Sequence, residues 1–213
     1  MKELNFPTFE KYANAAMRTL SDKQPLKEWV IEKGLTNNML HATLGLITEL
    51  KEMKEAVNNN DIINLFEEFG DLLWFITLGF KEFDLIDEAD KIMNNIDDYD
   101  IDDDIEPNDV LNMIKATMFY GKELDTSVIR QFMIQEFYGL LTIINLVSGL
   151  MDITYRELVD VIMTINISKL KKRYPDKYND MDAIERDLNS ERELIKDFLD
   201  KLKILQTTCV EDD

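Results

Sequence analysis

The chain has 213 residues, a length that fits one domain or one domain with additions. Its hydrophobic fraction of 45% supports a sizeable core and excludes a disordered chain. Its formal net charge of −19, from 43 acidic and 24 basic residues, repels phosphate backbones, so we expect no nucleic-acid partner.

Glycine and proline, which disfavour helix interiors, are scarce at 7 and 4 residues, and the composition therefore predicts an all-α fold. Helical spacing of apolar residues predicts helices over 9–20, 37–57, 62–83, 110–123, 127–150, 155–174 and 181–205, with a short segment at 29–31. Thr8 and Thr36 are expected to cap the first two long helices.

The chain changes character from Glu82 to Asp109. The part from Asn94 to Asp109 is dense in Asp and poor in large apolar residues, which predicts a solvated loop. It also contains a spacing that resembles a calcium-binding loop, formed by Asp98, Asp100, Asp102 and Asp109. Because Asp103 stands where that loop needs Gly and Pro107 would interfere, we do not expect calcium.

Cys209 is the single cysteine, so an intrachain disulfide is impossible and a reducing compartment is expected. The N-terminal segment MKELNFPTFEKY has no hydrophobic signal region. The longest mostly apolar run, Gly139 to Met151, is too short to span a bilayer. These features predict a soluble, cytoplasmic protein that has no membrane partner.

Two predicted helices each carry two carboxylates three residues apart, Glu49 with Glu52 and Glu68 with Asp71. At about 100° per residue, Glu49 and Glu68 fall inside the apolar sides of their helices, and Glu52 and Asp71 lie at the edges. Those apolar sides are formed by Ala42, Leu46, Leu50 and Met53, and by Leu65, Phe69, Leu72, Phe75 and Ile76.

Buried carboxylates need a compensating positive charge, because an unpaired buried charge is costly and like-charged neighbours add to that cost. Lys51 and Lys54 lie off this face, so a divalent cation is the favoured partner, and oxygen ligands suit Mg²⁺ or Mn²⁺. The alternative is a rim of acids held by Arg or Lys residues from elsewhere in the chain.

A second chemical feature lies near the end of the helix predicted over 155–174. Lys169 and Arg173 are four residues apart on one face, Asn166 is one turn before Lys169, and Tyr174 adjoins Arg173. Such a face can hold a phosphate chain by point charge and forked hydrogen bonds. The alternative is a basic last turn that stabilises the helix dipole.

Four segments, in this order, resemble the MazG-like all-α nucleoside triphosphate pyrophosphohydrolases: TFEKYANAAMRT, LHATLGLITELKEMKEAV, EEFGDLLWF and NISKLKKRYPDKY. That family carries an ExxE helix, an ExxD helix and a closing N-K-R-Y-P segment. Here fifteen residues separate Glu49-x-x-Glu52 from Glu68-x-x-Asp71, and the resemblance covers roughly residues 8–80 and 140–178.

The resemblance implies an oligomeric helical bundle that hydrolyses a (deoxy)nucleoside triphosphate to the monophosphate and pyrophosphate. The implied ligands of Mg²⁺, with Mn²⁺ as a possible substitute, are Glu49, Glu52, Glu68 and Asp71. Glu52 would help to activate the attacking water and, with Lys169 and Arg173, would be catalytic. The implied substrate contacts are Lys169, Arg173 and Tyr174 for phosphates, Asn166 for sugar or base, and Trp74 and His41 for the nucleoside. A core or surface role is the alternative for His41.

The chain departs from the family between Lys81 and Gly139, where about sixty residues are inserted, and again after Asp180. We therefore expect a domain over 1–180, interrupted by an insertion at about 81–139, and a C-terminal helical extension over 181–213. The insertion would supply a lid, part of a subunit interface, or a site for a protein partner.

Short helices with wide apolar faces, together with the resemblance, predict a homo-oligomer such as a dimer. The competing function is a catalytically idle helical module that binds a protein or senses nucleotides. The presence of all four acids and of the Lys169/Arg173 pair argues against an idle module. Within the enzyme hypothesis, a modified nucleotide or a guanosine alarmone is the alternative to a common nucleotide as substrate.

Overall fold

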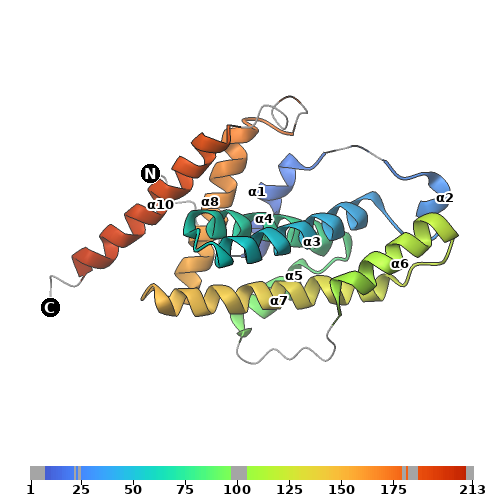
Figure 1. Ribbon diagram of the computed structural model, residues 1–213, viewed down its shortest axis with the longest axis horizontal. Coiled ribbons are helices and arrows are strands. Elements are labelled where there is room, and N and C mark those ends of the chain that lie inside the picture. The colour runs from blue at the N-terminus through green and yellow to red at the C-terminus, as the bar shows by residue number, and fades with distance from the viewer. Residues whose placement is uncertain are drawn as a thin grey trace.

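A computed structural model describes residues 8–21, 23, 25–96, 105–178, 181 and 187–209, with side chains to residue 202. Its elements are α1 (Phe9–Ala16), the 3₁₀ turn η1 (Met17–Thr19), α2 (Glu28–Ile31), α3 (Asn37–Asn58), α4 (Ile62–Glu82), α5 (Ile86–Asn94), α6 (Pro107–Tyr120), α7 (Thr126–Leu150), α8 (Tyr155–Arg173) and α10 (Leu188–Cys209) (Figure 1). The described part of the chain contains no strand, so the predicted all-α class is confirmed.

Side-chain caps fix where the helices begin. The hydroxyl of Thr8 accepts a hydrogen bond from the backbone N–H of Lys11, and that of Thr36 from the N–H of Met39, as predicted. Thr154 begins α8 through a reciprocal capping box with Glu157. These caps satisfy N–H groups that the first turn of a helix leaves without a partner.

Helices α3 and α4 form a hairpin that carries the predicted carboxylates. The turn between them contains Asn60 at φ 52°, and Asp61 then caps α4 by accepting from the N–H of Asn64. The two helices run side by side, and a Cβ added at Gly45 would lie 2.0 Å from the Phe75 ring. A larger residue than glycine at position 45 would therefore push the two helices apart.

Helix α4 lies at the centre of the bundle. Helices α1, α3, α7, α8 and α10 all pack against it, and its second half is buried almost continuously. This burial explains why its sequence is apolar nearly all round rather than along one stripe.

Among the described residues, α7 is the one helix that is long and apolar enough to cross a membrane. This helix is partly buried, with 33% of its most apolar stretch inside the protein, and Phe132, Phe137 and Leu141 belong to the shared core. The arrangement is thus compatible with a soluble protein.

The segment from Glu82 to Asp109 differs from the prediction in two places. Helix α5 was not predicted, although Leu85, Ala89, Ile92 and Met93 repeat at helical spacing and are buried, with α5 packed on α1. Helix α6 begins at Pro107, because proline is favoured in the first turn of a helix. Of the four acids whose spacing resembles a calcium-binding loop, Asp98, Asp100 and Asp102 lie outside the described residues, and Asp109 lies in the first turn of α6.

Residues of the predicted insertion and extension belong to the same hydrophobic core as the rest of the chain. Ile92 of α5, Ile114 of α6 and Phe132 of α7 join it, and so do Ile195 and Leu199 of α10. Helix α10 packs against α4 and α8. It begins at Leu188; Met181, where the sequence predicts the helix to begin, is also helical, and residues 182–186 lie outside the described part of the chain.

Candidate functional site

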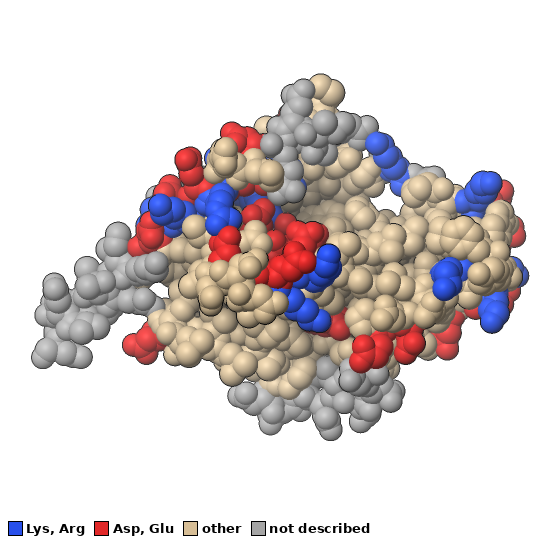
Figure 2. Space-filling view, viewed as in Figure 1, with Lys and Arg blue, Asp and Glu red and all other residues tan. Residues whose placement is uncertain are grey.

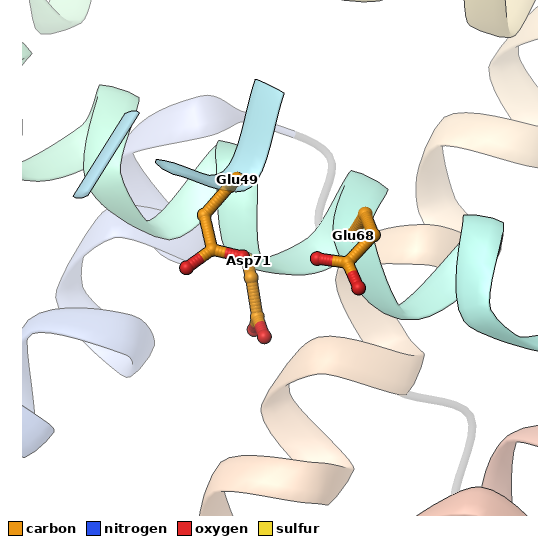
Figure 3. Close-up of side chains that lie close together, drawn as sticks. All are labelled: Glu49, Glu68 and Asp71. Atoms are coloured by element: carbon orange, nitrogen blue, oxygen red, sulfur yellow. The ribbon is translucent and has the colours of Figure 1, made fainter. Parts of the chain in front are cut away.

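Three carboxylates converge where α3 and α4 face α8. Glu49 from α3 and Glu68 and Asp71 from α4 extend toward the same space, as Figure 3 shows. One oxygen atom of each carboxylate lies within 4.8 Å of the others. The angular prediction that placed Glu49 and Glu68 on the inner sides of their helices is consistent with this arrangement, and Glu68 is buried.

Glu49 and Glu68 share a proton because burial disfavours their charged forms. Burial, a hydrogen bond with Glu49 and the nearby charges of Asp71, Glu49 and Glu52 raise the pKa of Glu68 to about 9. Burial also raises the pKa of Glu49 to about 7, although its hydrogen bond with Glu68 opposes this rise. At neutral pH, without a cation, Glu68 is therefore protonated and donates to Glu49.

Asp71 is held from α8 by two buried side chains. The Nζ atom of Lys169 lies 2.6 Å from both Asp71 oxygens and 3.4 Å from Oε1 of Glu67, and Lys169 itself is 1% exposed. Asn166 donates from Nδ2 to Oδ1 of Asp71 at 3.3 Å. This Lys169–Asp71 pair is in part the alternative that the sequence left open, in which a basic residue from elsewhere holds the acids.

A close approach between α4 and α8 makes the Asn166 contact possible. Gly70 lies against Asn166, and a Cβ added at position 70 would lie 2.9 Å from Cβ of Asn166. On its other side Asn166 accepts a hydrogen bond at 2.9 Å from the hydroxyl of Tyr12 on α1. Burial and the charge of Asp71 raise the pKa of Tyr12, so this hydroxyl keeps its proton and acts as a donor.

A pocket of about 320 Å³ opens beside the acids. It is lined by Thr19, Ser21, His41, Glu49, Asp71, Trp74, Phe75, Leu170, Arg173, Tyr174 and Tyr178. Carboxylates and a guanidinium thus share one cavity with several aromatic rings. Figure 2 shows acidic side chains gathered over the middle of one face of the molecule, with Lys and Arg side chains beside them.

The aromatic part of the pocket is fixed by packing and hydrogen bonds. The ring of His41 lies 5.4 Å from that of Trp74 and 5.5 Å from that of Phe75, both edge-on. The Trp74 indole N–H donates to Oγ1 of Thr19 at 3.1 Å and to the carbonyl of Ala16 at 3.3 Å. Partial burial lowers the pKa of His41, so its imidazole is neutral at pH 7.

Some of the predicted site residues lie outside this pocket. Glu52 is exposed and lines a separate depression with Glu55, Asp61 and Asn64, although its charge contributes to the raised pKa values of Glu49 and Glu68. Asn166 and Lys169 are buried behind Asp71 and do not line the pocket. His41, Trp74, Arg173 and Tyr174 do line it.

Two acids that sequence reasoning did not single out hold the basic residues of α8. Glu67 contacts Lys169, and Glu191 of α10 forms two hydrogen bonds with Arg173, at 2.8 Å to Nε and 2.6 Å to Nη2. Burial acts to lower the pKa of Arg173, but Glu191 more than offsets it, so that pKa is raised. Glu67 directly precedes Glu68 and was a visible candidate, whereas no local pattern connects position 191 with position 173.

The three clustered carboxylates fit a divalent cation that prefers oxygen ligands. Their oxygens, which lie within 4.8 Å of one another, would have to move closer together by side-chain rotation to bind one such ion. Loss of the proton shared by Glu49 and Glu68 would complete the ligand set.

Comparison of the chain with known protein families, curated proteins and solved structures finds no match.

Proposed function

We propose that this protein hydrolyses a (deoxy)nucleoside triphosphate to the monophosphate and pyrophosphate with Mg²⁺ as cofactor, on a bundle of the all-α NTP pyrophosphohydrolase type. The observation that carries the proposal is the convergence of Glu49, Glu68 and Asp71 beside a pocket that also contains Arg173 and several aromatic rings. Carboxylates suit a cation, the cation and the guanidinium suit phosphates, and rings suit a nucleobase.

Glu49, Glu68 and Asp71 would hold Mg²⁺, or Mn²⁺ in its place. The cation, when bound, neutralises phosphate charge and lowers the pKa of water. Lys169 and Asn166 hold the carboxylate of Asp71 from behind. Glu52, the next carboxylate along α3, lines the neighbouring depression rather than the pocket, but its charge acts on Glu49 and Glu68, and it is our candidate for accepting a proton from the attacking water.

Arg173 and Tyr174 lie in the same pocket and are the proposed contacts for the outgoing phosphates. The Arg173 guanidinium can make forked hydrogen bonds with phosphate oxygens. His41, Trp74 and Phe75 on the aromatic side are the proposed contacts of the nucleoside.

The direct test is a screen for pyrophosphate release from common NTPs and dNTPs, including dUTP and dCTP, with purified protein and Mg²⁺. Glu49→Gln should lower turnover at least a hundredfold by removing a cation ligand. The matched control is Glu55→Gln on the same helix, an exposed acid paired with Lys51, which should leave turnover unchanged. Absence of pyrophosphate release from every nucleotide would refute the proposal.

Glu52→Gln tests the proposed proton acceptor separately. We expect strongly reduced turnover with unchanged helical circular dichroism, because Glu52 is exposed and its replacement disturbs no packing. Wild-type turnover in this variant would remove Glu52 from the mechanism without affecting the three clustered carboxylates.

One observation favours the second candidate, a catalytically idle module that senses nucleotides or binds a protein. Lys169 and Arg173, the basic residues expected to bind phosphate, are both paired with carboxylates. A nucleotide-sensing module would bind a nucleoside triphosphate without releasing pyrophosphate, and a protein-binding module would do neither. Calorimetric binding combined with the release assay therefore separates the two functions.

We also propose that the protein is a homo-oligomer, with a dimer as the simplest form. Large apolar side chains are exposed on α3, α6 and α7, among them Leu44, Phe119, Leu146 and Leu150. A second subunit that covered part of this surface would lower its free energy in water. Light scattering that shows a stable monomer at micromolar concentration would contradict this proposal.

A further inference from the structure

The C-terminal helix α10 contributes a buried acid to the edge of the pocket. Glu191, in the first turn of α10, is 2% exposed and forms a bidentate pair with Arg173, with distances of 2.8 Å to Nε and 2.6 Å to Nη2. Bidentate pairing fixes the plane of a guanidinium as well as its position. The orientation of Arg173 is therefore set by a helix that begins 15 residues after it.

The pair is arranged so that Arg173 remains available to the pocket. Arg173 lines the cavity beside Asp71, whereas Glu191 does not, so the acid lies behind the guanidinium rather than between it and the cavity. Glu191 occupies the edge formed by Nε and Nη2. Among the described residues, no hydrogen-bond partner is found for Nη1 of Arg173, whose N–H groups can therefore donate to a ligand.

Helix α10 is also attached by contacts independent of Arg173. Nη2 of Arg192 donates to both carboxylate oxygens of Asp61, at 2.8 and 2.7 Å, and Ile195 and Leu199 are buried against the bundle. Lys172 donates to the carbonyl of Ser190 at 2.9 Å. Docking of the helix and orientation of Arg173 can therefore be separated by substitution.

We propose that Glu191 is a positioning residue for phosphate binding. It holds the Arg173 guanidinium with the Nη1 edge toward the pocket, and the C-terminal helix thereby contributes to the site. This inference rests on the proposed function, in which Arg173 binds the phosphates of the substrate. It assigns a role to the C-terminal extension, for which the sequence suggested none.

The experiment compares Glu191→Gln with Arg192→Gln in the full-length chain. Both substitutions remove one ion pair that docks α10, but only the first frees Arg173. We expect Glu191→Gln to raise KM for the triphosphate about tenfold with a smaller change in kcat, and to weaken binding of inorganic tripolyphosphate in Mg²⁺ equally. Arg192→Gln should leave both quantities at wild-type values.

A double-substitution cycle tests whether Glu191 acts through Arg173. In an Arg173→Gln background, Glu191→Gln should cause no further loss of tripolyphosphate binding, because the group that it positions is already absent. If Glu191→Gln fails to fold, Glu191→Asp replaces it, because Asp keeps the charge but its shorter side chain shifts the guanidinium.

Several results would overturn the inference. One is tripolyphosphate binding at the wild-type level in Glu191→Gln, and another is an equal loss of binding in Glu191→Gln and Arg192→Gln. The others are additive losses of binding in the double-substitution cycle and a wild-type protein that does not bind tripolyphosphate. Tighter binding by Glu191→Gln would show instead that Glu191 competes with phosphate for Arg173. If tripolyphosphate binding depends on Glu191 but no nucleotide is hydrolysed, the proposed function fails while this inference stands.

Discussion

The proton shared by Glu49 and Glu68 makes a quantitative prediction about stability without a cation. The pKa of Glu68 is about 9 in the folded protein, against 4.5 for an unperturbed glutamate. The folded state therefore keeps a proton that the unfolded state has lost. Because the unfolded state binds fewer protons over this range, the free energy of unfolding falls as pH rises, and it stops falling above about pH 9.

The size of the effect follows from one proton. Each pH unit changes the free energy of unfolding by about 1.4 kcal/mol per proton, so the loss from about pH 6.5 to about pH 8.5 is roughly 2–3 kcal/mol. Glu49, with a pKa of about 7, adds a loss of the same sign. His41, whose pKa is lowered by burial, contributes the opposite slope, but only below about pH 6.5.

Urea denaturation followed by circular dichroism in EDTA measures this slope. Glu68→Gln should remove most of it, whereas Glu55→Gln, which changes an exposed acid on α3, should keep it. Mg²⁺ should stabilise the wild type more at the high end of the range, because binding requires ionised carboxylates. Stability that stays constant or rises with pH in EDTA, or an unchanged slope in Glu68→Gln, would refute the reasoning.

Two further predictions concern the contact between α4 and α8. Gly70→Ala places a Cβ 2.9 Å from that of Asn166 and should destabilise the protein by about 1–3 kcal/mol in thermal or urea unfolding, whereas Gly139→Ala, which meets nothing within 4 Å, should be neutral or slightly stabilising. Lys169→Met removes the ammonium group that pairs with Asp71 and Glu67, and it should lower the free energy of unfolding in EDTA by about 3 kcal/mol. Most of that loss should be recovered in Mg²⁺, and an equal loss with and without Mg²⁺ would contradict the proposed cation site.

Local sequence patterns were sufficient for the helices and for the inner positions of two acids. Thr8 and Thr36 cap the helices that they were expected to cap, because a cap depends only on residues three positions apart. Glu49 and Glu68 were placed inward because helical periodicity alone fixes the angle of a side chain. Helix α5 was missed because the Asp-rich stretch after it obscured a short apolar repeat.

Only the tertiary structure decided which partner each charged side chain pairs with. Lys169 and Asn166 were expected to contact substrate, and the structure places them behind Asp71, because α8 crosses α4 closely at Gly70. The pairing of Arg173 with Glu191 joins residues that no helical period relates. The sequence by itself thus determined the helices and the inward carboxylates, which are short-range properties. The charge partners depend on how the helices pack, and that geometry is a property of the whole core.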